Sequence, residues 1–272
     1  MKIAIIGCGY VGAAFARYCR QELGFVVTAT TTTVEKVSTL NEVADRVVIL
    51  KGSDKDSLYS VVQGQDAVLM CVGAWRSDYR DTYLCTAENL VAILRQTPEV
   101  KSLIYTSSCS VYGNQQGKLV QENDPIVPGD DKNQILAHTE EVLLSATSDK
   151  LRVCILRLAG IYGDGRELVK IYSRVPGKTL PGDGSEPSNW IHLDDIVGAI
   201  ALACQQQLQG LYNLVNDAQL TRREVIDTVL AKHNLPPVIW DSSKSSPRSY
   251  NARLLNGKIK EAGYQLIHPQ IF

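Results

Sequence analysis

The feature that most constrains this chain is a glycine pattern in its first twelve residues. An apolar run, Ile3–Ile6, is too short for a helix and is followed by Gly7, Gly9 and Gly12, with helical spacing from Val11 onward. In a strand–turn–helix setting, the first glycine permits the tight turn. The second lets a pyrophosphate approach the backbone, and the third lets the helix pack closely on the strand. The helix N-terminus offers N–H groups to phosphates. The alternative is a glycine turn that binds nothing. The predicted cofactor contacts in this loop are Gly7, Gly9, Tyr10, Val11 and Gly12.

Strand-like and helix-like segments alternate through the first 160 residues. The predicted strands are 3–6, 25–30, 46–50, 66–72, 103–107 and 151–157, and the predicted helices are 10–23, 54–62, 79–96 and 132–146. Alternation of this kind indicates an α/β fold with a doubly wound parallel sheet, whose strands are apolar because both faces are covered. We therefore expect a Rossmann domain over residues 1–160.

Glycine and proline become frequent after residue 160, and this part is expected to form a smaller substrate lobe over 161–272, with some chain returning to the core. A strand is predicted at 210–215, and helices at 167–174, 194–207, 221–233 and 251–262. Thr221 and Glu224 have the spacing of a capping box. Asp194 is expected to cap its helix, and His192 to bond to nearby backbone.

Size and charge exclude several classes of protein. The 272 residues are 44% hydrophobic and carry a formal net charge of −1, with no block of like charge. A nucleic-acid or membrane-surface role therefore has no electrostatic support, and no apolar run is long enough to cross a membrane. The seven cysteines and four histidines are scattered, with no CxxC pair. This spacing predicts reduced thiols in the cytoplasm, no disulfide framework and no structural zinc. A monomer or homodimer that takes a small-molecule substrate, or none, is expected.

Ligands of doubly wound sheets bind beyond the carboxyl ends of the strands. Applied to this chain, the rule adds further cofactor contacts at Val72, Gly73, Ser107 and Leu158, and a substrate or nicotinamide contact at Trp75.

The residues that would recognise the adenosine ribose follow the second strand. An acidic residue there selects NAD, but this chain has four threonines, 30–33, and no carboxylate before Glu35. The hydroxyls of Thr31 and Thr32, with Lys36, are suited to a 2′-phosphate. The cofactor is therefore expected to be NAD(P), with NADP favoured over NAD, although the threonine run also suits a strand end.

Several segments together resemble one family. They are the glycine loop, Asp66-Ala-Val, Thr106-Ser-Ser-Cys-Ser-Val-Tyr-Gly113, Leu156-Arg-Leu-Ala-Gly-Ile-Tyr-Gly163, Trp190-Ile-His-Leu-Asp-Asp195 and Tyr212-Asn-Leu. In this order the chain is similar to the extended short-chain dehydrogenase/reductases, also called NAD-dependent epimerase/dehydratases, from Lys2 to about Pro269. The resemblance implies a serine that orients the substrate oxygen, and Ser108 matches it.

The resemblance also implies a tyrosine with a lysine four residues later, and this chain departs from it. Residues 131–141 contain no tyrosine, and no tyrosine in the chain has a lysine at that spacing. Tyr112, Tyr79, Tyr83 and His138 are each candidates for a substitute proton donor, and each also has an ordinary packing explanation. Arg166 is a candidate for binding an anionic substrate group, or for an ion pair with Asp164 or Glu167 in its loop.

Two functions remain open from the sequence. The first is an oxidoreductase or epimerase/dehydratase-like enzyme on a small or nucleotide-linked hydroxy or carbonyl substrate. The second is a dinucleotide-binding sensor or assembly factor without turnover, which the missing tyrosine and lysine permit.

Overall fold

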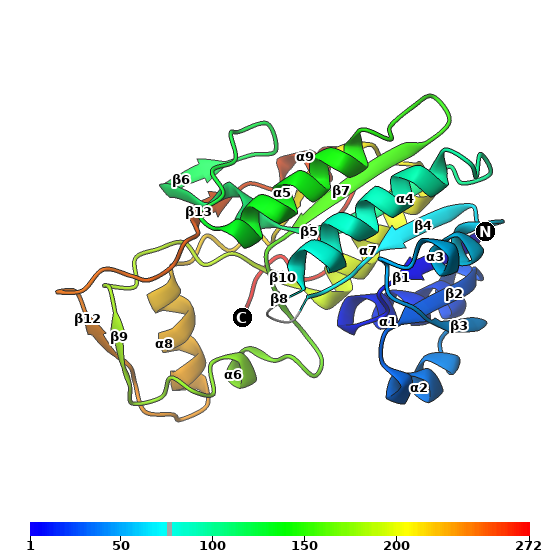
Figure 1. The fold of residues 1–272 in the computed structure, drawn as a ribbon. Helices are drawn as coiled ribbons and strands as arrows, with labels where there is room; N and C mark the ends of the chain where they lie inside the picture. The colour runs from blue at the N-terminus through cyan, green and yellow to red at the C-terminus, as the bar shows by residue number, and fades with distance from the viewer. Residues whose placement is uncertain (75–77) are drawn as a thin grey trace. The chain divides into compact units, whose positions relative to one another are not determined.

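The fold is built on a seven-stranded parallel sheet, as predicted. The computed structural model describes residues 1–74 and 78–272. Figure 1 labels most of the sheet's strands, and their order along the sheet is β11-β7-β5-β4-β1-β2-β3. The strands are β1 (Lys2–Ile6), β2 (Val26–Thr31), β3 (Arg46–Ile49), β4 (Ala67–Met70), β5 (Ser102–Ser108), β7 (Arg152–Leu158) and β11 (Gly210–Leu214). The order reverses at β1, where Ile5 lies opposite Ala29 of β2 and Leu69 of β4. The crevice at such a reversal is where ligands of doubly wound sheets bind.

Helices follow the strands at the predicted places, and one short helix in this part, α2 (Val37–Asn41), was not predicted. α1 (Tyr10–Tyr18) continues as a π-helical turn through Cys19–Leu23 and ends at Gly24, whose φ is +62°. The others in this part are α2 (Val37–Asn41), α3 (Lys55–Val62), α4 (Thr86–Leu94), which follows a π-helical turn at Arg80–Cys85, α5 (Asp131–Leu144) and α7 (Leu193–Gln206). α3, α4 and α5 bury apolar side chains such as Leu58, Leu90 and Leu143 in one core against the sheet. This burial is the main favourable term in the folding of such a layered structure.

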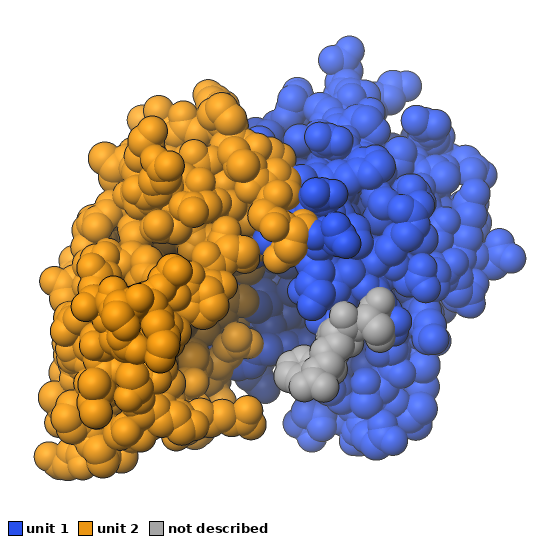
Figure 2. Space-filling model, turned by 60° about the vertical axis from the view of Figure 1, so that its left-hand side comes forward, with its two compact units in different colours: residues 1–108, 131–157, 196–212 blue, residues 109–130, 158–195, 213–272 orange. Residues whose placement is uncertain are grey.

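The chain forms two compact units that are discontinuous in sequence (Figure 2). Unit 1 comprises residues 1–108, 131–157 and 196–212, and unit 2 comprises 109–130, 158–195 and 213–272. The sequence-based division at residue 160 is continuous and so differs from this one. Residues 196–212 belong to unit 1 although they follow residue 160.

Unit 2 contains paired short strands and further helices. β6 (Asn114–Val120) pairs with β13 (Asn251–Leu254), β8 (Gly160–Tyr162) with β10 (Trp190–His192), and β9 (Thr179–Pro181) with β12 (Ile239–Asp241). The helices of this part are α6 (Leu168–Ile171), α8 (Arg222–Lys232) and α9 (Gly257–Glu261). The capping box of α8 is present, with Thr221 and Glu224 bonded to each other's backbone N–H.

Two details of the prediction for this part are wrong. The helix expected at 251–262 is a strand at its start, because pairing with β6 takes residues 251–254 before the helix begins. Asp194 is not an N-cap, because α7 already begins at Leu193. Among the described residues, no helix combines the length and apolar character needed to span a membrane.

Candidate functional site

The glycine loop has the backbone geometry that its spacing predicted. Gly7 has a φ of +91°, and a Cβ there would lie 2.8 Å from the Cys71 carbonyl oxygen. A Cβ on Gly12 would lie 2.8 Å from the Gly7 carbonyl oxygen, so both positions require glycine for packing. Gly9 differs from both, because its φ is −86° and nothing lies within 4 Å of the place of a Cβ. The space at Gly9 is open, as a loop that receives a phosphate requires.

Thr30 of β2 holds this loop in place. Its hydroxyl accepts a hydrogen bond from the Gly7 N–H at 2.9 Å, and its carbonyl accepts from the Cys8 N–H at 2.7 Å. Thr30 is only 2% exposed, so no water can substitute for the hydroxyl. The polar threonine at a buried strand end is therefore part of the loop's architecture.

Replacing Thr30 by valine is expected to destabilise the protein by about 1–3 kcal/mol, because the isosteric side chain leaves the partly buried Gly7 N–H without its acceptor. Equilibrium urea unfolding measures this effect. Thr32 is exposed, so Thr32→Val is the matched control and should change stability by less than about 0.5 kcal/mol. Equal losses in the two variants would contradict the role assigned to Thr30.

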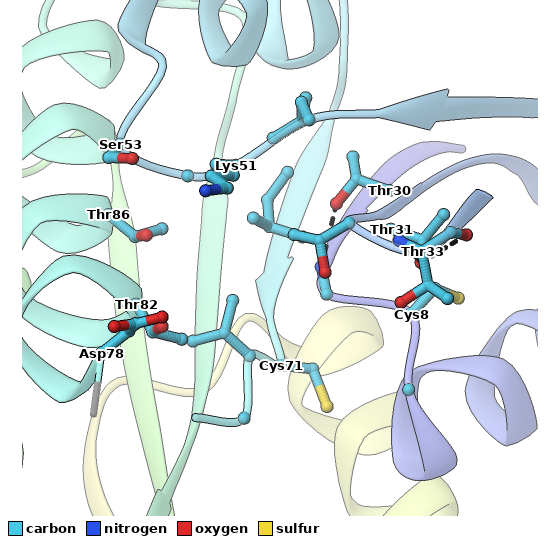
Figure 3. A pocket seen from close by; sticks show the side chains of 18 of the residues that line it. Cys8, Thr30, Thr31, Thr33, Lys51, Ser53, Cys71, Asp78, Thr82 and Thr86 are labelled. Atoms are coloured by element: carbon cyan, nitrogen blue, oxygen red, sulfur yellow. Dashed lines mark hydrogen bonds between the residues drawn. The ribbon is translucent and has the colours of Figure 1, made fainter. Parts of the chain in front are cut away.

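A cavity of about 460 Å³ opens at the carboxyl ends of β1, β2, β3 and β4, entirely within unit 1 (Figure 3). Its volume is within the usual range for small-molecule sites. Of the predicted cofactor contacts, it is lined by Gly7, Gly9, Thr31, Thr32, Val72 and Gly73. The cavity adjoins the N-terminus of α1, where the backbone N–H groups of the first turn favour an anion. The residues present thus fit the phosphate end of a dinucleotide.

The adenosine side of the cavity carries hydroxyls and a lysine. Thr31 and Thr33 form a local turn in which the Thr31 hydroxyl accepts the Thr33 N–H at 3.1 Å. Lys36 lines the cavity together with Thr30–Thr33, whereas Glu35 is absent from the lining. Among the charged residues that line the cavity, Lys36 is therefore the one nearest in sequence to these threonines.

One side of the cavity is lined by residues that were not predicted from the sequence. It follows the end of β3 and the start of the π-helical turn before α4, and consists of Leu50, Lys51, Gly52, Ser53, Asp78, Asp81, Thr82 and Thr86. The rule for parallel strands applies to β3 as it does to β1 and β2, so the residues after Leu50 could have been found from the sequence. Gly52 is required there, because a Cβ would collide with Thr86.

Two cysteines also line the cavity. Burial raises the pKa of Cys8 to about 12 and that of Cys71 to about 11. Both are therefore protonated thiols at neutral pH, and neither acts as a nucleophile there, since the thiolate is the reactive form.

A buried ion pair between α5 and β7 contacts the carboxyl end of β5 through Ser107. The Arg157 guanidinium binds both carboxylate oxygens of Glu140 on α5, with the shortest contact at 2.7 Å. Ser107 donates its hydroxyl proton to the same carboxylate at 2.6 Å. Each of these residues is 5% exposed or less. Ser107, predicted as a cofactor contact, is thus bonded to Glu140 and is not among the residues that line the cavity.

The two candidate catalytic residues have different surroundings. Ser108 is the last residue of β5 and is partly exposed. Tyr112 is fully buried in unit 2, where its hydroxyl lies 2.8 Å from the Asn213 side-chain oxygen and 3.2 Å from the Gln121 carbonyl oxygen. These are the contacts of a buried packing residue.

The other tyrosines considered as donors form a small cluster in unit 1. The Tyr79 and Tyr83 rings are 5.2 Å apart, and the Lys132 ammonium of α5 lies 5.1 Å from the centre of the Tyr79 ring. The Tyr83 hydroxyl accepts the Ala74 N–H at 3.3 Å, and burial raises the pKa of Tyr83. His138 is exposed on α5. Tyr79 and Lys132 therefore approach each other from different segments of the chain.

The remaining predicted contacts are not part of the cavity. Leu158 is buried in unit 2. Arg166, also in unit 2, is exposed, and its backbone N–H donates to the Gly163 carbonyl. Glu167, considered as an ion-pair partner of Arg166, pairs with Lys170 at 2.7 Å. Tyr10, Val11 and Gly12 form the first turn of α1. Trp75 lies outside the described residues.

Comparison with known proteins agrees with this fold. The model of the NAD dependent epimerase/dehydratase family matches residues 3–214. Protein YeeZ of Escherichia coli strain K12 is 31% identical over 281 residues, which cover 98% of this chain and 96% of the relative.

Solved structures share the fold at lower identity. UDP-glucose 4-epimerase of Thermus thermophilus, in complex with NAD, superposes with a TM-score of 0.81 at 19% identity, covering 98% of this chain and 94% of that one. A conserved protein of unknown function from Silicibacter pomeroyi has a TM-score of 0.80 at 21% identity, with coverage of 99% and 95%. At this identity the likeness concerns the fold alone.

Proposed function

We propose that this chain, which belongs to the NAD dependent epimerase/dehydratase family, binds a nicotinamide adenine dinucleotide in the cavity of unit 1 and uses it as an oxidoreductase. The substrate class is a small or nucleotide-linked hydroxy or carbonyl compound. The observation that carries the proposal is the open space at Gly9, beside the α1 N-terminus, within a cavity lined by the ends of β1, β2, β3 and β4. The NAD complex of the Thermus relative supports the same cofactor class.

We further propose that the cofactor is NADP. The lining contains Thr31, Thr32 and Lys36, and Glu35 is not part of it. Hydroxyls and an ammonium group bind a 2′-phosphate, whereas a carboxylate at this place would repel it and would bind the free 2′-hydroxyl of NAD.

Replacing Lys36 by glutamine is expected to weaken NADPH binding about fivefold to tenfold, in line with about 1 kcal/mol for one partly exposed charge pair. NADH binding should change less than about twofold, because NADH lacks the phosphate. Fluorescence titration of the reduced nicotinamide measures both constants. Lys55→Gln is the control, because Lys55 is an exposed lysine of α3 and does not line the cavity. Equal effects on the two cofactors would contradict the assignment to the 2′-phosphate.

The dinucleotide supplies hydride transfer when bound. In the proposed reaction the Ser108 hydroxyl orients the substrate oxygen by a hydrogen bond, as the family resemblance implies. The proton comes from a group other than the family's usual tyrosine. Among the candidate proton donors, Tyr79 has a lysine ammonium, that of Lys132, near its ring.

A second candidate function rests on the missing Tyr-x-x-x-Lys pattern. A protein that keeps the cofactor fold without that pair is suited to sense a dinucleotide rather than turn it over. The experiment that separates the two begins with mass spectrometry of the ligand that co-purifies with the protein. In the second step, NADPH oxidation is measured in the presence of a panel of carbonyl compounds related to that ligand. Turnover that Ser108→Ala removes, with NADPH affinity unchanged, supports the enzyme. NADPH that binds and is never oxidised supports the sensor.

A further inference from the structure

Three metal-ligating side chains from distant parts of the sequence meet in unit 2. His192 ends β10, Asp194 lies in the first turn of α7, and His268 belongs to the C-terminal segment. One ligand atom from each residue lies within 4.8 Å of the other two. The histidines are 76 positions apart, which is why their spacing in the sequence predicted no metal site.

The distances suit a small divalent cation. Oδ2 of Asp194 lies 3.3 Å from Nδ1 of His192 and 2.9 Å from Nε2 of His268. Metal–ligand bonds of zinc to imidazole nitrogen and carboxylate oxygen place neighbouring donors of a tetrahedral site about 3.3–3.5 Å apart. Small side-chain movements would therefore bring all three donors to bonding distance from one ion.

The electronic arrangement also favours a cation. The Asp194 backbone N–H donates to Nδ1 of His192 at 3.2 Å, so this nitrogen presents a lone pair. Oδ2 of Asp194, also an acceptor, lies 3.3 Å from the same nitrogen. Two acceptors at this distance repel, and a cation bound by both would remove that repulsion, with His192 Nδ1 exchanging the Asp194 N–H for the ion.

Surrounding residues hold the ligands in place. Asp195 is completely buried, and its carboxylate accepts the backbone N–H groups of Ile267 at 2.6 Å and His268 at 3.1 Å. This carboxylate fixes the backbone that carries His268. The Tyr162 ring packs edge-on against His192 with 5.0 Å between centroids, and the two imidazole rings are 3.7 Å apart. Supporting contacts of this kind orient metal ligands before the metal binds.

We infer that His192, Asp194 and His268 form a binding site for a borderline divalent cation of the zinc class. Two imidazoles and one carboxylate are a typical donor set for zinc and related transition metals. The Asp194 side chain is 57% exposed and that of His268 36%, so an ion can reach the site and retain water at its remaining positions. A bound ion would join the C-terminal segment to the end of β10 and the start of α7.

Zinc titration of the full chain tests this inference, with the protein carrying no histidine tag. We expect one saturating equivalent of Zn²⁺ in competition with a chromophoric chelator, and a higher unfolding temperature with zinc, since a ligand of the folded state stabilises it. His268→Gln and Asp194→Asn should each weaken binding at least tenfold and remove the thermal shift. Co²⁺ should give a visible d–d absorption in the wild type that both variants lack.

His233→Gln is the matched control, because His233 is an exposed histidine at the end of α8 in the same unit. It should bind zinc like the wild type. Metal-free circular dichroism and thermal unfolding show whether each variant folds. Failure of the folded wild type to bind zinc saturably would overturn the site, as would undiminished binding in folded Asp194→Asn and His268→Gln. Neither result bears on dinucleotide binding, which belongs to unit 1.

Discussion

Replacing Gly9 by valine is expected to weaken dinucleotide binding at least tenfold while leaving the fold intact. Gly9 has a negative φ and nothing within 4 Å of the place of a Cβ, so the added side chain meets no protein atom. It would instead occupy the part of the cavity that lies beside the N-terminus of α1. In the proposed complex that space belongs to the pyrophosphate, and a phosphate held farther from the α1 amides loses its hydrogen bonds to them. A tenfold loss corresponds to about 1.4 kcal/mol.

The measurement is a fluorescence titration with NADPH, together with thermal unfolding without ligand. Gly9→Ala should give an intermediate loss, because one methyl group fills less of the space. Gly257→Val is the matched control, since Gly257 also has open space at its Cβ position and no positive φ, and lies in unit 2. Unchanged NADPH affinity in a folded Gly9→Val protein would show that no phosphate approaches this loop.

Replacing Arg157 by methionine is expected to lower the free energy of unfolding by about 3–5 kcal/mol, the usual cost of leaving one charge of a buried pair uncompensated. Arg157 and Glu140 are 3% and 2% exposed, and the guanidinium makes several contacts to the carboxylate. Without Arg157, the Glu140 carboxylate keeps only the Ser107 hydroxyl among its side-chain contacts described above. The pair connects α5 to β7, so the loss concerns the core of unit 1.

Urea unfolding should show this loss as a fall of about 1 M in the midpoint for a chain of this size. The double variant Glu140→Leu with Arg157→Met should recover much of the stability, because it removes both buried charges together. Arg152→Met is the control on the same strand, since Arg152 is exposed and its side chain bonds only to Gln209 in the part of the chain that the structure describes. Its effect should stay below about 0.5 kcal/mol. A similar loss in Arg152→Met and Arg157→Met would contradict the assignment to the buried pair.

The sheet was predictable because its strands are apolar and its first helices are amphipathic. The composition of residues 66–72 indicates a central strand, and Thr221 with Glu224 indicates a helix start, and both are present in the structure. The strand at 251–254 was mistaken for helix because its pairing partner, β6, is more than 100 positions away. Local periodicity carries no information on such a partner.

The candidate site was predictable to the extent that strand ends determine it. The glycine loop and Thr30–Thr33 were found, and Lys51 and Ser53 would have been found had the same rule been applied to β3. The role of Glu140 in holding Ser107, and the meeting of His192 with His268, depend on tertiary contacts between distant segments. Sequence spacing alone cannot give these contacts.

The most direct test of the central proposal is a titration of the wild-type chain with NADPH and NADH, followed by fluorescence and by calorimetry. We expect saturable binding of one dinucleotide per chain, tighter for NADPH, and competition by adenosine 2′,5′-bisphosphate, which carries the phosphate that Lys36 would bind. Absence of saturable binding of either dinucleotide at millimolar concentration, with the protein folded, would contradict the account. Tighter binding of NADH would leave the cavity as the dinucleotide site and would overturn the preference for NADP.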